Sequence, residues 1–126
     1  MTVTSDDIRK TAATLDGQII RTPVLEAPML SRQFGCDLFL KMECLQHTSS
    51  FKARGALNAM IGLSAEQRKK GVITMSAGNH AQAVAYHAER MGIPATIVMP
   101  AQTPFAKVQK TAVTPIVLMD HLRLLT

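Results

Sequence analysis

Short apolar segments alternate with helix-forming segments through the second half of the chain, and this alternation constrains the fold more than any other feature. Residues 72–75, 95–99 and 116–119 have the length and apolar content of buried strands. Helical patterns lie between them at residues 80–91 and 105–111. Strands that alternate with helices predict βαβ units, so we expect an α/β fold in which flanking helices and a parallel sheet form three layers.

The first half of the chain predicts shorter elements. Thr4 or Ser5 is suited to cap a helix that ends at Gly17. The pattern then predicts an extended segment, a short helix and a strand, at residues 19–25, 29–34 and 37–42.

Composition limits the class of protein. The 126 residues are 47% hydrophobic and 18% charged, which is typical of a globular domain with a real core. The sequence has no apolar run near the length of a membrane span and no signal-peptide core, so we expect a cytoplasmic protein with no membrane partner. The net charge of +5 is scattered along the sequence, and nucleic-acid binding is not expected. Cys36 and Cys44 form no disulfide framework and no metal-ligand spacing, so no metal is predicted.

Lys52 lies at the predicted start of a helix, with Ser50 as a plausible N-cap. In a half-buried site, desolvation and the helix dipole would both disfavour the ammonium form of this lysine. A neutral lysine amine is a nucleophile for a carbonyl group. The alternative is an ordinary surface lysine beside a core Phe51, and spacing alone favours that alternative.

A second candidate segment, Ser76, Ala77, Gly78 and Asn79, joins a predicted strand to a predicted helix. Small residues at a helix start leave backbone N–H groups open to a carboxylate or phosphate. The alternative is an ordinary turn in which Asn79 caps the helix. His80 could act as a base, although a role in orienting the loop is favoured.

Two motifs carry a family resemblance. The segment KMECLQHTSSFKARGA, residues 41–56, resembles the cofactor-lysine segment of the threonine dehydratase and serine racemase family. These are fold-type II enzymes that use pyridoxal phosphate. The segment SAGNHAQ, residues 76–82, resembles the substrate loop of that family, and the whole resemblance runs from about residue 8 to residue 110.

The resemblance implies roles for individual residues. Lys52 would be the catalytic residue and would hold pyridoxal 5′-phosphate covalently, with Phe51 beside the cofactor ring. Asn79 would hydrogen-bond the 3′-oxygen of that ring. The loop from Ser76 through Ala77, Gly78 and Asn79 to His80 would bind the carboxylate of an amino-acid substrate.

The reaction implied is dehydration and deamination of L-threonine or L-serine to a 2-oxo acid and ammonia. A serine racemase or a dehydratase of another hydroxy-amino acid is the alternative within this chemistry. Racemase relatives carry a serine that moves a proton at the position of Ala77, and this difference favours elimination.

The resemblance also implies a domain organisation. Residues 1–50 would belong to the large domain of the relatives, and residues 51–126 would form part of the small domain. The intact family implies a homo-oligomer. The sequence departs from the family from about residue 111 and lacks its phosphate-binding glycine cluster, so we expect an incomplete, truncated form. A non-catalytic remnant that binds no cofactor is the alternative from another class.

Overall fold

The computed structural model describes residues 2–109, 111 and 114–119. Its helices and strands, in chain order, are α1 (Ser5–Leu15), β1 (Val24–Glu26), α2 (Pro28–Phe34), β2 (Phe39–Lys41), the 3-10 turns η1 (Glu43–Leu45) and η2 (His47–Ser49), α3 (Lys52–Ile61), α4 (Ala65–Lys70), β3 (Val72–Met75), α5 (Asn79–Met91), β4 (Ala95–Pro100), α6 (Phe105–Gln109) and β5 (Ile116–Met119).

A parallel sheet organises the second half of the chain. Its strand order is β3-β4-β5, with Val72 opposite Ala95 and Ile97 opposite Ile116. Helix α5 connects β3 to β4, and α6 connects β4 to β5. The predicted α/β fold with a parallel sheet and flanking helices is therefore confirmed.

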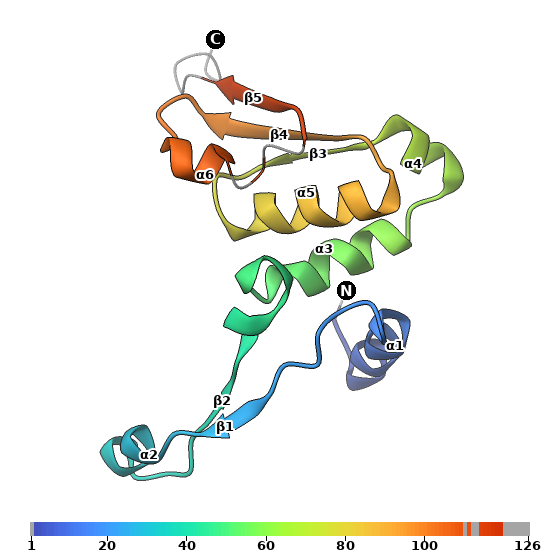
Figure 1. Ribbon diagram of the computed structural model, residues 1–126. Coiled ribbons are helices and arrows are strands. Elements are labelled where there is room, and N and C mark those ends of the chain that lie inside the picture. The colour runs from blue at the N-terminus through green and yellow to red at the C-terminus, as the bar shows by residue number, and fades with distance from the viewer. Residues whose placement is uncertain (1, 110, 112–113, 120–126) are drawn as a thin grey trace.

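The sheet, α5 and α3 form three successive layers, visible in Figure 1. The helix α5 buries a run of alanines, among them Ala81, Ala85 and Ala88, each at most 1% exposed. These small side chains let α3 approach closely with its own apolar stripe, which consists of Ala53, Ala56, Leu57 and Met60. On the sheet side, Ile97 and Met99 of β4 complete the core.

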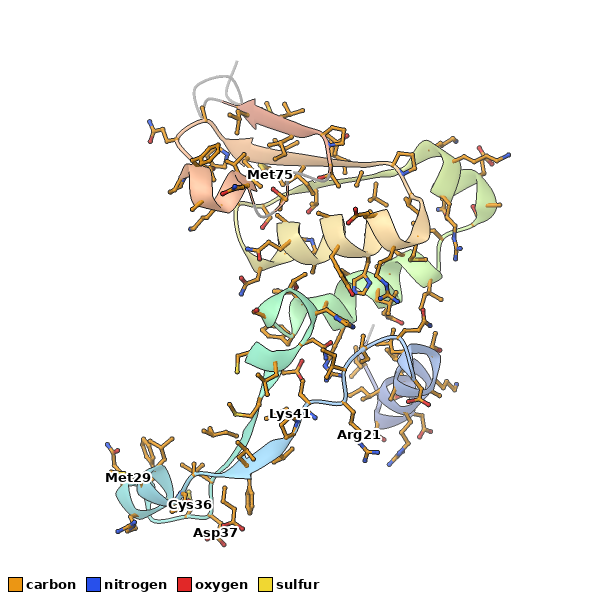
Figure 2. All side chains as sticks on the ribbon, in the orientation of Figure 1. Arg21, Met29, Cys36, Asp37, Lys41 and Met75 are labelled. Carbon is orange, nitrogen blue, oxygen red and sulfur yellow. The ribbon has the colours of Figure 1, made fainter. Side chains whose placement is uncertain are left out.

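The elements β1, α2 and β2 form an arm that projects from the α/β body (Figure 1). Strands β1 and β2 pair antiparallel, with Leu25 opposite Leu40. Both of these leucines are exposed, and so is Met29, which lies with Cys36 and Asp37 at the far end of the arm (Figure 2). The arm therefore has an apolar surface without a core of its own.

Local sequence signals account for most helix ends. Thr4 and Asp7 form a reciprocal capping box at the start of α1, as predicted for Thr4. Gly35 and Gly92 adopt the left-handed conformation that ends α2 and α5.

The predicted last strand is present as β5, although residues 112–113 and 120–126 of the predicted atypical tail lie outside the described residues. Across the described part of the chain, each helix is too short or too polar to cross a membrane.

Candidate active site

Lys52 is the first residue of α3, and its side chain is exposed. Its Nζ lies 5.2 Å from the centroid of the Phe51 ring, which is itself 59% exposed. The half-buried setting considered for this lysine is therefore not present among the described residues. Instead, an amine and an aromatic ring lie side by side and open to solvent.

The predicted N-cap is wrong in one respect. Ser50 has an extended backbone, with φ −158° and ψ 155°, but its side chain does not cap α3. Its hydroxyl is enclosed by protein without a hydrogen-bond partner, and so is that of Thr48. The cause is local, because Thr48 and Ser49 both have positive φ, at 59° and 54°, and turn the chain just before the helix.

The start of α3 is held by an ion pair that sequence patterns did not indicate. Arg54 Nε and Nη2 donate to Glu43 Oε2 and Oε1 at 2.8 and 2.7 Å. The hydroxyl of Thr22 also donates to Glu43 Oε1. The two hydrogen bonds from Arg54 are the main reason that the pKa of Glu43 falls to about 2. The carboxylate therefore stays ionised over the ordinary pH range.

The second segment, Ser76–Gly78, joins β3 to α5 and is half-buried. The Ser76 hydroxyl accepts a hydrogen bond from Gly78 N at 3.2 Å, so the loop closes partly on itself. Gly78 occupies the N-cap position and Asn79 is already inside α5, so the alternative that Asn79 caps the helix is wrong. The side chains of Asn79 and His80 are exposed at the helix start.

The structure brings the two segments onto one packed helix pair. The helix α3 begins with Lys52, α5 begins with Asn79, and the two helices pack directly (Figure 1). Among the described residues no hydrogen bond links the Lys52 segment to the Ser76–His80 loop.

Two histidines without a predicted role, His47 of η2 and His87 of α5, lie at this helix pair. Tyr86 of α5 stacks on His47 of η2, with ring centroids 5.0 Å apart. His87 is fully buried, and neither of its ring nitrogens has a hydrogen-bond partner. Burial, followed by the charges of Arg90 and His47, lowers the pKa of His87 to about 4. His87 lies three and four positions after the buried Val84 and Ala83, so helical periodicity could have indicated its burial. No local pattern, by contrast, indicates the pairing of His47 with Tyr86.

The exposed side chains near the two helix starts fit the ring and aldehyde of pyridoxal phosphate. Lys52 offers a primary amine, Phe51 an aromatic ring and Asn79 a side-chain amide. Together these groups can bind an aromatic ring that carries an aldehyde. The start of α5 has no side-chain cap, and a Cβ added at Gly78 would meet nothing within 4 Å, so a carboxylate can approach the backbone. The seven glycines of the sequence are isolated from one another, so a glycine cluster for the phosphate is lacking.

The described residues thus combine a parallel α/β fold with an exposed amine at the start of α3 and a start of α5 that lacks a side-chain cap. The sequence model described as "Pyridoxal-phosphate dependent enzyme" matches residues 15–114, and the chain belongs to that family. The predicted family is thereby confirmed.

Individual members of this family show which enzymes the chain is similar to. The chain is 50% identical over 109 residues to an L-threonine ammonia-lyase of Thermotoga maritima, covering 86% of this chain and 27% of that protein. It is 44% identical over 108 residues to a serine racemase of Schizosaccharomyces pombe, covering 86% of this chain and 33% of that protein. The structure of maize serine racemase superposes with a TM-score of 0.87 at 40% identity, over 95% of this chain and 37% of that one.

These comparisons make the chain a homologue of threonine dehydratases, hydroxyaspartate ammonia-lyases and serine racemases. The chain spans 27% to 33% of the length of these curated relatives.

Proposed function

We propose that the chain supplies the lysine-bearing part of an ammonia-lyase that dehydrates and deaminates L-threonine or L-serine. In this proposal Lys52 is the catalytic residue, and Phe51, Lys52 and Asn79 bind the cofactor. The loop Ser76, Ala77, Gly78, Asn79 and His80 binds the substrate carboxylate.

One observation carries the proposal. Lys52 stands at the solvent-open start of α3 beside an exposed aromatic ring, in a chain of a family that uses pyridoxal phosphate. An amine in this position is accessible to an aldehyde, and the adjacent ring offers an apolar surface for a flat aromatic partner.

In this proposal each group of residues has a separate role in the reaction. When bound, pyridoxal phosphate supplies an electron sink for negative charge at the substrate Cα. The Nζ of Lys52 takes the Cα proton. Backbone N–H groups at the start of α5 hold the substrate carboxylate, because the helix dipole favours an anion there. The amide of Asn79 orients the cofactor ring.

Ala77 supports elimination over racemisation. A methyl group cannot donate or accept a proton, so this loop position offers no acid to the second face of the substrate. Return of a proton to the second face of the substrate Cα, with Ala77 as the donor, therefore does not compete with loss of the β-hydroxyl. The same reasoning makes serine racemisation the alternative to be tested, since racemases are among the relatives.

The arm is proposed to belong to a larger unit. Residues 1–50 place Val24, Leu25, Phe39 and Leu40 on exposed strands, and such a surface is normally covered in a stable protein. We propose that these residues pack in the large domain of a complete enzyme and that residues 51–126 form part of its small domain. That complete enzyme would also supply the phosphate site and the oligomer contacts.

The first experiment tests Lys52 directly. The 126-residue chain is incubated with pyridoxal phosphate, reduced with borohydride, and mapped by peptide mass spectrometry. We expect Lys52 to carry more adduct than Lys69, an exposed lysine of α4. The Lys52→Arg variant should lose the preferred adduct and Lys69→Arg should keep it. Equal labelling of all lysines would instead support a non-catalytic remnant.

The second experiment tests the reaction. The chain is joined to the C-terminal part of the Thermotoga relative, and L-serine is supplied as substrate. We expect ammonia and 2-oxo acid to form faster than D-serine, and Ala77→Ser to raise the share of D-serine. D-serine as the main product of the unchanged loop would reverse the ranking.

A further inference from the structure

The first turn of α3 is electrostatically unfavourable by itself. Lys52 and Arg54 are both cations, the turn contains no acidic residue, and no side chain caps its N–H groups. Because the positive end of the helix dipole lies here, two cations in this turn are repelled by it. The start of the helix therefore needs support from outside its own sequence.

Glu43 supplies that support. Its carboxylate receives both hydrogen bonds from Arg54, and it is only 18% exposed in a pair whose arginine is 33% exposed. Bidentate, partly shielded pairs of this kind fix geometry better than exposed single contacts do. The first turn of α3 is thus paired with an acidic group from η1. Glu43 precedes Arg54 by eleven positions in the chain.

The pair is anchored further at its other end. Thr22 donates its hydroxyl to Glu43, and Lys41 Nζ donates to the backbone oxygen of Thr22 at 2.6 Å. Figure 2 shows Lys41 at the base of the arm, beside the segment that carries Arg21. Arg54 Nη2 also donates to Ile20 O at 3.4 Å. Three stretches of chain, residues 20–22, 41–43 and the start of α3, therefore meet at this ion pair.

Helix geometry connects the pair to Lys52. Successive residues of an α-helix are rotated by about 100°, so Lys52 and Arg54 lie about 200° apart around the axis of α3. Ala53, between them, is fully buried in the three-layer body. Lys52 and Arg54 therefore lie on opposite edges of the buried stripe. A contact that fixes Arg54 fixes the rotation of α3, and with it the side on which the amine emerges.

We infer that Glu43 and Arg54 are positioning residues that set the direction of the Lys52 amine, through the rotation of the first turn of α3. They act through the backbone of α3 and are not themselves catalytic residues. The inference rests on the proposed function only for the role of the amine, because the contacts that set its direction stand independently.

The test compares the labelling of two lysines within one molecule. The 126-residue chain and its variants are treated with pyridoxal phosphate and borohydride, and the ratio of Lys52 adduct to Lys69 adduct is measured. Glu43→Gln and Arg54→Gln should each lower this ratio about fivefold, the effect of losing one charge-assisted contact. The double variant should lower it no further, because the two residues act as one pair.

A matched control removes an acid from a different ion pair. Asp6 bonds Arg9 at 2.8 Å on α1, away in the chain from both of the lysines that are compared, and both side chains are more than 70% exposed. Asp6→Asn should leave the labelling ratio unchanged. A ratio in the Glu43 and Arg54 variants equal to that of the wild-type chain, with the circular dichroism spectrum preserved, would overturn the inference.

A variant with a smaller change is included in case the Glu43 and Arg54 variants do not fold. Thr22→Val removes one hydrogen bond to Glu43 and keeps the ion pair, and it should lower the ratio about twofold. Hydrogen exchange at residues 54–56 gives a second readout that needs no cofactor. We expect faster exchange there in Glu43→Gln, with exchange in α5 unchanged.

The two proposals fail in different ways. If the wild-type chain shows no preference for Lys52, the proposed function is wrong, and hydrogen exchange alone decides the positioning role. Unchanged exchange at residues 54–56 in Glu43→Gln overturns that role, whereas faster exchange confined to these residues supports it.

Discussion

The hydroxyl of Tyr86 lies 3.2 Å from Nδ1 of His47, and the two rings stack at an interplanar angle of 29°. This contact ties η2, which immediately precedes the Lys52 segment, to the middle of α5. It joins residues 39 positions apart in the chain. The turn that leads into α3 is therefore held against the second layer of the fold by a polar aromatic pair.

We expect the Tyr86→Phe variant to be less stable by about 1 kcal/mol, because it keeps the stacked ring and loses one hydrogen bond. Chemical denaturation measures this difference. Tyr86→Leu loses the stacking as well, so its loss should be larger than that of Tyr86→Phe. Equal stabilities for Tyr86→Phe and the wild-type chain would show that the hydrogen bond adds nothing.

The stability of the chain should fall on mild acidification because of His87. Its pKa is lowered from 6.5 to about 4, so between these values the unfolded chain binds more protons than the folded chain. The free energy of unfolding should therefore decrease by roughly 2–3 kcal/mol as the pH falls from 6.5 to 4. Denaturant titrations across this range measure the slope.

A control separates His87 from the acidic groups. The His87→Leu variant should lose most of the slope between pH 6.5 and 4. Glu43 acts in a lower window, because its contribution is present above pH 4.5 and is lost as the pH falls towards about 2. A slope that persists in His87→Leu would assign it to another group.

Substitution at Gly71 should be costly. This residue has φ +86°, and a Cβ there would lie 2.4 Å from the backbone oxygen of Pro94. We expect Gly71→Ala to destabilise the chain by about 2–4 kcal/mol, through both backbone strain and this overlap. Thermal unfolding provides the measurement.

Gly35 offers the matched comparison for Gly71. It also has a positive φ, at +66°, but a Cβ there would meet nothing within 4 Å. Gly35→Ala should therefore cost only about 1 kcal/mol, the conformational term alone. Equal losses at the two positions would mean that the approach of Pro94 has no effect.

The isolated chain should self-associate through its arm. Met29, Phe34 and Phe39 are 80%, 64% and 59% exposed, and apolar surface of this extent favours association. We expect concentration-dependent light scattering that decreases when Phe39 and Leu40 are both changed to serine. The control is a variant in which Val3 and Ile8 are both changed to serine. Both residues are exposed, Ile8 in α1 and Val3 just before it. A monodisperse monomer at all concentrations would contradict this prediction.

Local sequence determined the elements of this protein. The alternation of apolar strands and amphipathic helices predicted β3, α5, β4 and β5, because periodicity follows directly from which face is buried. Capping signals at Thr4 and left-handed glycines at Gly35 and Gly92 also need only neighbouring residues. The motifs around Lys52 and Ser76 led to the family, which the comparisons confirm.

Tertiary structure decided the contacts between these elements. The pairs Glu43–Arg54 and His47–Tyr86 join residues 11 and 39 positions apart, and a linear pattern does not reveal such partners. The same reason explains the error at Ser50 and the exposure of Lys52. Whether Ser50 caps its helix depends on the turn at Thr48 and Ser49, and whether Lys52 is buried depends on what packs over it. Periodicity specifies which side of an element is buried, whereas only the assembled layers specify what each side chain contacts.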